Sequence, residues 1–94
     1  MIFDAGTTDV PVAGTAVQLN NTEDKVRVIE VRARPGNSGD MYFGVSDVSS
    51  TNGRTLQPGE LVVINFEDGS EPFSKFYVDA EISGDDVDWT VIIR

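Results

Sequence analysis

Four acidic side chains stand close together near the end of the sequence: Glu81, Asp85, Asp86 and Asp88. Clustered carboxylate oxygens are ligands that Ca²⁺ prefers, so these four are candidate metal ligands. The segment lacks the spaced D-x-D-x-D-G pattern of a loop built for calcium. The other interpretation is an acidic surface that is tolerated because net charge favours solubility, and of the two we prefer this one.

Residues for catalysis are scarce. The chain contains neither His nor Cys, which excludes a His general base, zinc sites of thiolates or imidazoles, and disulfide bonds. Lys25 and Lys75 stand among acidic residues that should keep them charged rather than nucleophilic. No glycine motif for phosphate binding is present. We therefore expect a protein that is not an enzyme and has no cofactor.

Basic side chains gather in segment 25–34, where Lys25, Arg27, Arg32 and Arg34 are opposed only by Glu30. Segment 67–88 is strongly acidic, and the whole chain carries a net charge of −9. Such a charge repels nucleic acid and anionic membranes, so neither is expected as a partner. The three arginines are candidate interface residues, and the other interpretation is that both segments are solvated faces.

The elements that position these side chains are predicted to be strands. Short runs of Val, Ile, Phe and Tyr are separated by Gly and Pro, without a helical repeat of apolar residues. Strands are expected near 10–12, 15–19, 26–34, 41–46, 61–66, 75–82 and 87–93, which predicts a small antiparallel β-sandwich or barrel of about seven strands. With 94 residues, the chain is expected to form a single β domain, 1–94.

A first hairpin is predicted around segment 35–39, which is dense in turn residues. Folding the chain about this turn places Val31 opposite Phe43 on an apolar face. On the outer face it places the Arg32 guanidinium beside the Tyr42 ring, as a stacked pair. Tyr42 therefore joins the candidate interface residues.

A second hairpin is predicted around segment 83–86. Its register places Ala80 opposite Trp89, which makes Trp89 a core residue. The same register places Glu81 opposite Asp88 on the exposed face, where like charges destabilise the pairing.

Exposed apolar residues are expected at two places. In strand 61–66, inward Val62, Ile64 and Phe66 leave Leu61 and Val63 pointing outward, to be covered by a loop or by another subunit. Segment 1–9 is a candidate N-terminal interaction arm, with Ile2 and Phe3 as its apolar residues. No run approaches the length of a membrane span, and the first residues lack the features of a leader, so we expect a soluble chain made in a cytoplasm.

One part of the sequence resembles a known family. Segment 37–46 with Val48 follows the pattern N-x-G-x-[VIM]-Y-[VF]-G-x-S-x-V, and a Gly-x-x-Leu turn, P-G-E and Y-V-x-A follow at 53–56, 58–60 and 77–80. This pattern is similar to that of small structural proteins of tailed-bacteriophage virions. The resemblance extends from about Ala13 to Arg94.

The resemblance implies a capsid decoration, or cement, protein that binds the outer surface of the phage head and stabilises the shell. The major capsid protein would be its partner, and a homotrimer is expected because capsid lattices present threefold sites. The chain would be made in the host cytoplasm and located on the virion. Two alternatives stay open: a tail or head-fibre β module, and a carbohydrate-binding module in which Tyr42, Tyr77 or Trp89 stacks on sugar rings.

Overall fold

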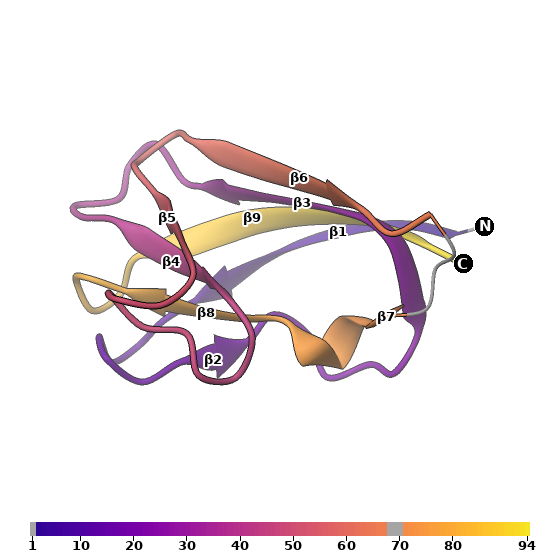
Figure 1. The fold of residues 1–94 in the computed structure, drawn as a ribbon. Coiled ribbons are helices and arrows are strands. Elements are labelled where there is room, and N and C mark those ends of the chain that lie inside the picture. Colours follow the sequence, from indigo (N-terminus) through magenta and orange to yellow (C-terminus); the bar gives the residue numbers. More distant parts are fainter. Residues whose placement is uncertain (1, 68–70) are drawn as a thin grey trace.

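The computed structural model describes residues 2–67 and 71–94. This part of the chain forms strands and one short 3₁₀ helix, arranged as two packed antiparallel sheets (Figure 1). No helix among the described residues is long and apolar enough to cross a membrane. The elements are β1 (Ile2–Asp9), β2 (Val17–Gln18), β3 (Lys25–Ala33), β4 (Met41–Gly44), β5 (Arg54–Leu56), β6 (Leu61–Asn65), β7 (Glu71–Pro72), η1 (Phe73–Lys75), β8 (Tyr77–Ala80) and β9 (Asp86–Ile93).

The five-stranded sheet has the order β1-β9-β3-β6, and β7 pairs with the beginning of β3. The four-stranded sheet has the order β2-β8-β4-β5. In Figure 1 the two sheets lie one above the other, and the beginning of β1 lies beside the end of β9, where Ile2 pairs with Ile93. The predicted all-β sandwich is therefore confirmed, and the described residues form nine strands in place of about seven.

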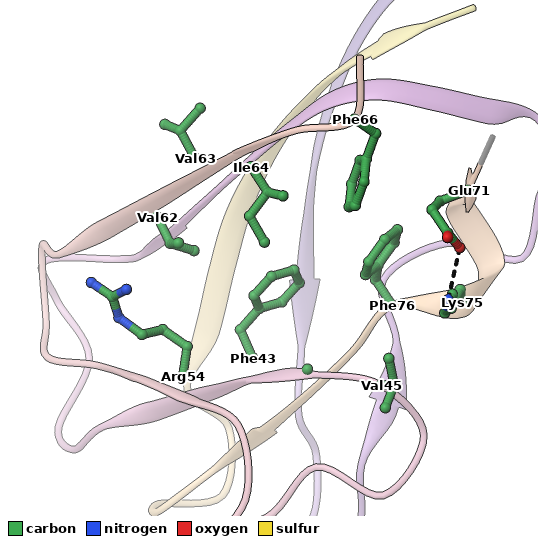
Figure 2. A pocket seen from close by; sticks show the side chains of 11 residues that line it. Phe43, Val45, Arg54, Val62, Val63, Ile64, Phe66, Glu71, Lys75 and Phe76 are labelled. Carbon is green, nitrogen blue, oxygen red and sulfur yellow. Dashed lines mark hydrogen bonds and ion pairs between the residues drawn. The ribbon is translucent and has the colours of Figure 1, made fainter. Parts of the chain in front are cut away.

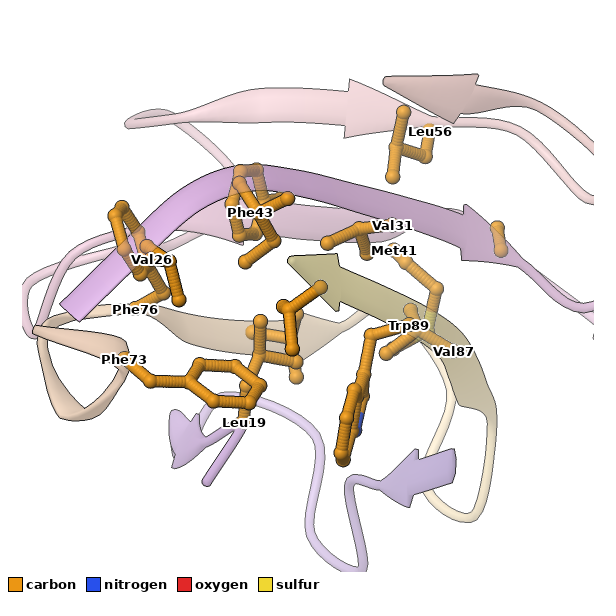
Figure 3. Close-up of a cluster of buried hydrophobic side chains, with 14 of the residues drawn as sticks. Leu19, Val26, Val31, Met41, Phe43, Leu56, Phe73, Phe76, Val87 and Trp89 are labelled. Atoms are coloured by element: carbon orange, nitrogen blue, oxygen red, sulfur yellow. The ribbon is translucent and has the colours of Figure 1, made fainter. Parts of the chain in front are cut away.

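The core lies between the sheets, and the alternation of buried and less buried residues that builds it is clearest in β9. In β9, Val87, Trp89, Val91 and Ile93 are buried, and the residues between them are half-buried. Figure 3 shows Trp89 among the other apolar side chains, where its ring meets Phe73 edge-on at 5.0 Å. The prediction that Trp89 belongs to the core is confirmed.

The first predicted hairpin is wrong, because segment 35–39 joins the two sheets instead of two neighbouring strands. Val31 pairs with Val62 and with Trp89 in the five-stranded sheet. Phe43 pairs with Val78 in the four-stranded sheet. Both side chains still face the core, since alternation is satisfied equally when two strands face each other across a sandwich.

The second predicted hairpin is wrong for the same reason. Strand β8 pairs with β2 and β4, whereas β9 pairs with β1 and β3. Asp88 therefore stands beside Thr7 and Arg32. The predicted repulsion between Glu81 and Asp88 does not arise in this register.

The strand prediction also missed β1, β5 and β7, and segment 10–12 is not a strand. Strand β1 alternates poorly in polarity, because its core-side positions include Asp4 and Gly6. Its pairing with the apolar strand β9 organises it instead. The predicted interaction arm is thus an edge strand from Ile2 onward, while Met1 lies outside the described residues; its role in interaction stays a prediction.

Candidate interaction surface

Several of the predicted interface residues share the outer face of the five-stranded sheet. Three rows of paired residues cross this face, and they place Phe3, Arg32, Leu61 and Val63 on it, alternating with the core positions. We call this surface the outer face. Its rows are Phe3–Ile92–Val28–Asn65, Ala5–Thr90–Glu30–Val63 and Thr7–Asp88–Arg32–Leu61.

The outer face carries exposed apolar side chains at both of its edges. Phe3 on β1 is 71% exposed, and Val63 and Leu61 on β6 are 53% and 46% exposed. Half-buried Val28 and Ile92 lie between the two edges. Large apolar side chains gathered on one face are typical of an interaction site. The predicted outward orientation of Leu61 and Val63 is confirmed, while the side chain of Ile2 lies outside the described part of the structure.

One end of the outer face is charged, and its charges are paired within the molecule. Arg32 Nη2 lies 2.6 Å from Asp88 Oδ2, and Arg34 Nη1 lies 3.5 Å from Asp88 Oδ1. Thr7 donates a hydrogen bond of 3.1 Å to the same carboxylate. The hydrogen bond from Arg32 lowers the pKa of Asp88, against the opposing effect of its burial. The basic and acidic segments thus partly neutralise each other here.

Two other predicted interface residues lie apart from this group. Arg27 is half-buried, and its guanidinium donates a hydrogen bond of 3.2 Å to the carbonyl of Glu67. Tyr42 lies on the outer side of the other sheet, paired with Asp79 and Thr55, and is only 8% exposed. The predicted stacking of Arg32 on Tyr42 is therefore wrong, because the whole sandwich separates the two side chains.

The environment of Tyr42 is acidic. Burial raises the pKa of its phenol, and the nearby carboxylates of Glu81, Asp40 and Asp79 raise it further. A polar hollow of about 490 Å³ adjoins Tyr42, lined also by Ala13, Gly14, Ser49, Ser50, Asp79, Ala80 and Glu81. Sequence reasoning missed this hollow, since Tyr42 and loop 45–53 meet only in the folded chain.

The four acidic residues considered as candidate metal ligands make contacts within the protein. Asp85 is buried, and its two carboxylate oxygens accept hydrogen bonds from the main-chain N–H groups of Ser38 and Gly39 at 2.8 to 3.1 Å. Glu81 Oε1 accepts one from the N–H of Asp40 at 3.2 Å. The remaining two candidates face the arginines at the charged end of the outer face. Within the described residues, no group of three acidic side chains is arranged to hold a metal ion.

An apolar groove of about 540 Å³ opens between the sheets beside β6 (Figure 2). Phe76 packs against Phe43 and Phe66 at its floor, with ring centroids 5.9 and 5.5 Å apart. The other lining residues are Gly44, Val45, Arg54, Val62, Val63, Ile64, Glu71 and Lys75. The alternation of β6 predicted that Val62, Ile64 and Phe66 point inward, but not that the sandwich stays open at this edge.

Comparison with known proteins gives a likeness to a solved structure. No protein-family model matches the chain, and no curated protein matches it. Among solved structures, the crystal structure of SPBc2 prophage-derived protein YomS is similar, with a TM-score of 0.50 and 11% sequence identity. The alignment covers 100% of this chain and 96% of that protein. At this identity the likeness shows a shared fold, a β domain that extends along nearly the whole of both chains.

Proposed function

We propose that this chain is a structural protein of a bacteriophage virion, and specifically a capsid decoration protein. The observation that supports this proposal is the outer face, which presents the exposed apolar side chains of Phe3, Leu61 and Val63. The structural neighbour is a prophage-derived protein, and the alignment covers 96% of it. The motifs in segment 37–60 are similar to those of small phage virion proteins. The role that follows is binding through contact area, rather than catalysis.

A decoration protein acts by mass action on the assembled shell. It binds the folded and assembled capsid and not its separated parts, so each bound copy stabilises the assembled state. The major capsid protein is the proposed partner, on the outer surface of the head. Phe3, Leu61 and Val63 supply the apolar contacts in this account, and the virion surface is the proposed location.

We also propose that the chain associates with itself as a homotrimer. Closed symmetric assemblies are the usual form of soluble oligomers. A trimer placed on a local threefold site of the capsid lattice would bind through three equivalent contacts, and so with avidity. Sedimentation velocity at micromolar concentration tests this, because a strict monomer in solution and on the capsid contradicts it.

The proposed function is tested by adding the purified protein to heads that lack it. We expect saturable co-sedimentation with heads and a higher temperature of head disruption when the protein is bound. Tails purified from the same phage serve as the control surface. Binding to tails alone, or no gain in head stability at saturation, would contradict a decoration role.

A carbohydrate-binding function is a second candidate, favoured by the polar hollow beside Tyr42. Hydroxyl and carboxylate groups of Ser49, Ser50, Asp79 and Glu81 line it and could bind sugar hydroxyls. Trp89 does not contribute, since it is 7% exposed and its indole N–H donates to Thr8. Selective, saturable binding on a glycan array that Tyr42→Ala abolishes would favour this function over the first.

A further inference from the structure

Two strands form the open edges of the five-stranded sheet. Strand β1 pairs only with β9, and β6 pairs only with β3; no strand in the described part of the chain covers their other edges. We propose that β1 of one copy pairs with β6 of the next copy, which extends the sheet across the subunit boundary. This inference deepens the proposed self-association and rests on it.

The hydrogen-bond pattern shows which main-chain groups are available at the β6 edge. Ala33 N–H donates to the carbonyl of Glu60, and Phe66 N–H donates to that of Arg27. Because hydrogen-bonded pairs alternate along an antiparallel ladder, Val62 and Ile64 direct their main-chain groups toward β3. The main-chain N–H and C=O groups of Leu61, Val63 and Asn65 therefore point away from the sheet.

The β1 edge has the same arrangement. Val10 N–H donates to the carbonyl of Asp85, so the even-numbered residues of β1 face β9. The N–H and C=O groups of Phe3, Ala5 and Thr7 point outward. In agreement, the N–H of Ala5 is bonded at 2.9 Å to the carboxylate of the adjacent Asp4 and not to β9.

The two edges match in direction and in register. Each neighbouring pair in the order β1-β9-β3-β6 is antiparallel, so a second copy in the same orientation presents its β1 antiparallel to β6. Extending the rows of the outer face places Ala5 of that copy beside Val63. Phe3 then falls beside Asn65 and Thr7 beside Leu61, so the outward groups of the two strands meet.

Charge complementarity favours this pairing over the alternatives. In the same register Asp4 falls opposite Ile64, on the groove side of β6. The groove carries Arg54, and also Lys75, which is paired with Glu71 at 2.7 Å (Figure 2). Strand β1 contains Asp4 and Asp9 and no basic residue, so pairing β1 with another β1 would give neither carboxylate a cation. Pairing β6 with another β6 would form a closed dimer, in which the β1 edges of both copies remain uncovered. A β1–β6 contact is heterologous, so it can close into a ring such as the proposed trimer.

Cysteine cross-linking tests the inference cleanly, because the chain has no Cys of its own. Two variants, Ala5→Cys and Val63→Cys, are purified separately, mixed and oxidised gently. Residues paired in this way lie about 5.5 Å apart between Cα atoms, within the range a disulfide spans. We expect the mixture of Ala5→Cys and Val63→Cys to cross-link about tenfold or more faster than a mixture of Val12→Cys and Val63→Cys. The reason is that strand pairing raises the effective concentration of the two thiols. Val12 is 59% exposed and lies in a loop, so it measures random collision.

Each outcome decides the inference. Equal rates for the Ala5→Cys and Val12→Cys mixtures would overturn it, and so would the fastest cross-linking from Val63→Cys alone, which would indicate β6–β6 pairing. A second variant, Val63→Lys, should convert the oligomer to monomer without loss of fold, since Val63 is exposed. Saturable binding to heads without the mixed cross-link would reject this contact and leave the decoration role intact. The mixed cross-link without head binding would support this contact and contradict the decoration role.

Discussion

Asp88 Oδ2 lies 2.6 Å from Arg32 Nη2, across the pair that joins β9 to β3. Arg32 belongs to the basic segment 25–34, where the sequence predicted an interface. Asp88 belongs to the acidic segment 67–88, where the sequence predicted repulsion between carboxylates. In the folded chain they neutralise each other at one end of the outer face. The exposed apolar side chains of Phe3 and Val63 remain available for contacts with a partner.

The Arg32–Asp88 pair should make a small, pH-dependent contribution to stability. Because the pKa of Asp88 is lowered in the folded state, the contribution is present above the unfolded pKa of about 3.9 and is lost as the pH falls through the folded pKa. Both side chains are about one third or more exposed, so Asp88→Asn should lower the free energy of unfolding near neutral pH by at most about 1 kcal/mol.

Urea denaturation near neutral pH and again at about pH 3 measures this effect. The difference between wild type and Asp88→Asn should shrink in acid. The exposed carboxylate of Asp47 provides the control, and Asp47→Asn should change little at either pH. A difference of the same size at both pH values would contradict the assignment.

Asp85 is expected to stabilise the fold far more than any exposed acid. Its carboxylate binds the N–H groups of Ser38 and Gly39 and so ties the link between β3 and β4 to the link between β8 and β9. Asp85→Ala leaves those groups without their acceptor and should cost about 2 to 3 kcal/mol, since hydrogen bonds to a buried charged group are among the strong ones. Chemical denaturation measures the cost, and a loss below about 0.5 kcal/mol, the range typical of surface substitutions, would count against this role.

Gly6 lets β1 lie directly over the indole of Trp89. A Cβ atom at position 6 would lie 2.5 Å from Trp89 Cζ2, so either the ring or the strand must move. Gly6→Ala should destabilise by about 1 to 3 kcal/mol, as overpacking does, and should change the fluorescence of the single Trp. At Gly36 a Cβ meets nothing within 4 Å, so Gly36→Ala should be close to neutral. Similar losses for the two variants would contradict the packing account.

The exposed apolar pair on β6 should matter for head binding and not for folding. Leu61→Ser with Val63→Ser removes about half-exposed side chains, so stability should change by no more than about 0.5 kcal/mol per site. Binding to heads should weaken about tenfold or more, because burying such side chains contributes on the order of a kcal/mol each. Ile82→Ser is the matched control, with Ile82 43% exposed in a turn away from the outer face. Equal loss of binding in both would show that the outer face is not the docking surface.

The sequence carried enough information for the fold class and for most inward positions, but not for strand pairing. Alternation correctly placed Val31, Phe43 and Trp89 in the core, and the same alternation fits either neighbours within a sheet or partners across a sandwich. The turn residues of segment 35–39 are equally compatible with a hairpin and with a crossing between sheets.

The candidate surface was predicted only in part, for the same reason. Leu61 and Val63 were found because β6 is apolar on both sides. Their grouping with Phe3 depends on β1 pairing with β9, and β1 itself has little local strand signal around Gly6. Tyr42 was assigned to the wrong side of the molecule because its strand was paired with the wrong partner.

The central claim is that the chain is part of a phage head, and quantitative mass spectrometry and cryo-microscopy of purified virions test it most directly. Tailless heads are measured beside complete particles. The decoration role predicts copies in the hundreds per particle, retained by tailless heads and resolved on the outer shell with the outer face toward the major capsid protein. A few to about a dozen copies that disappear with the tail, or no copies in the virion, would contradict it.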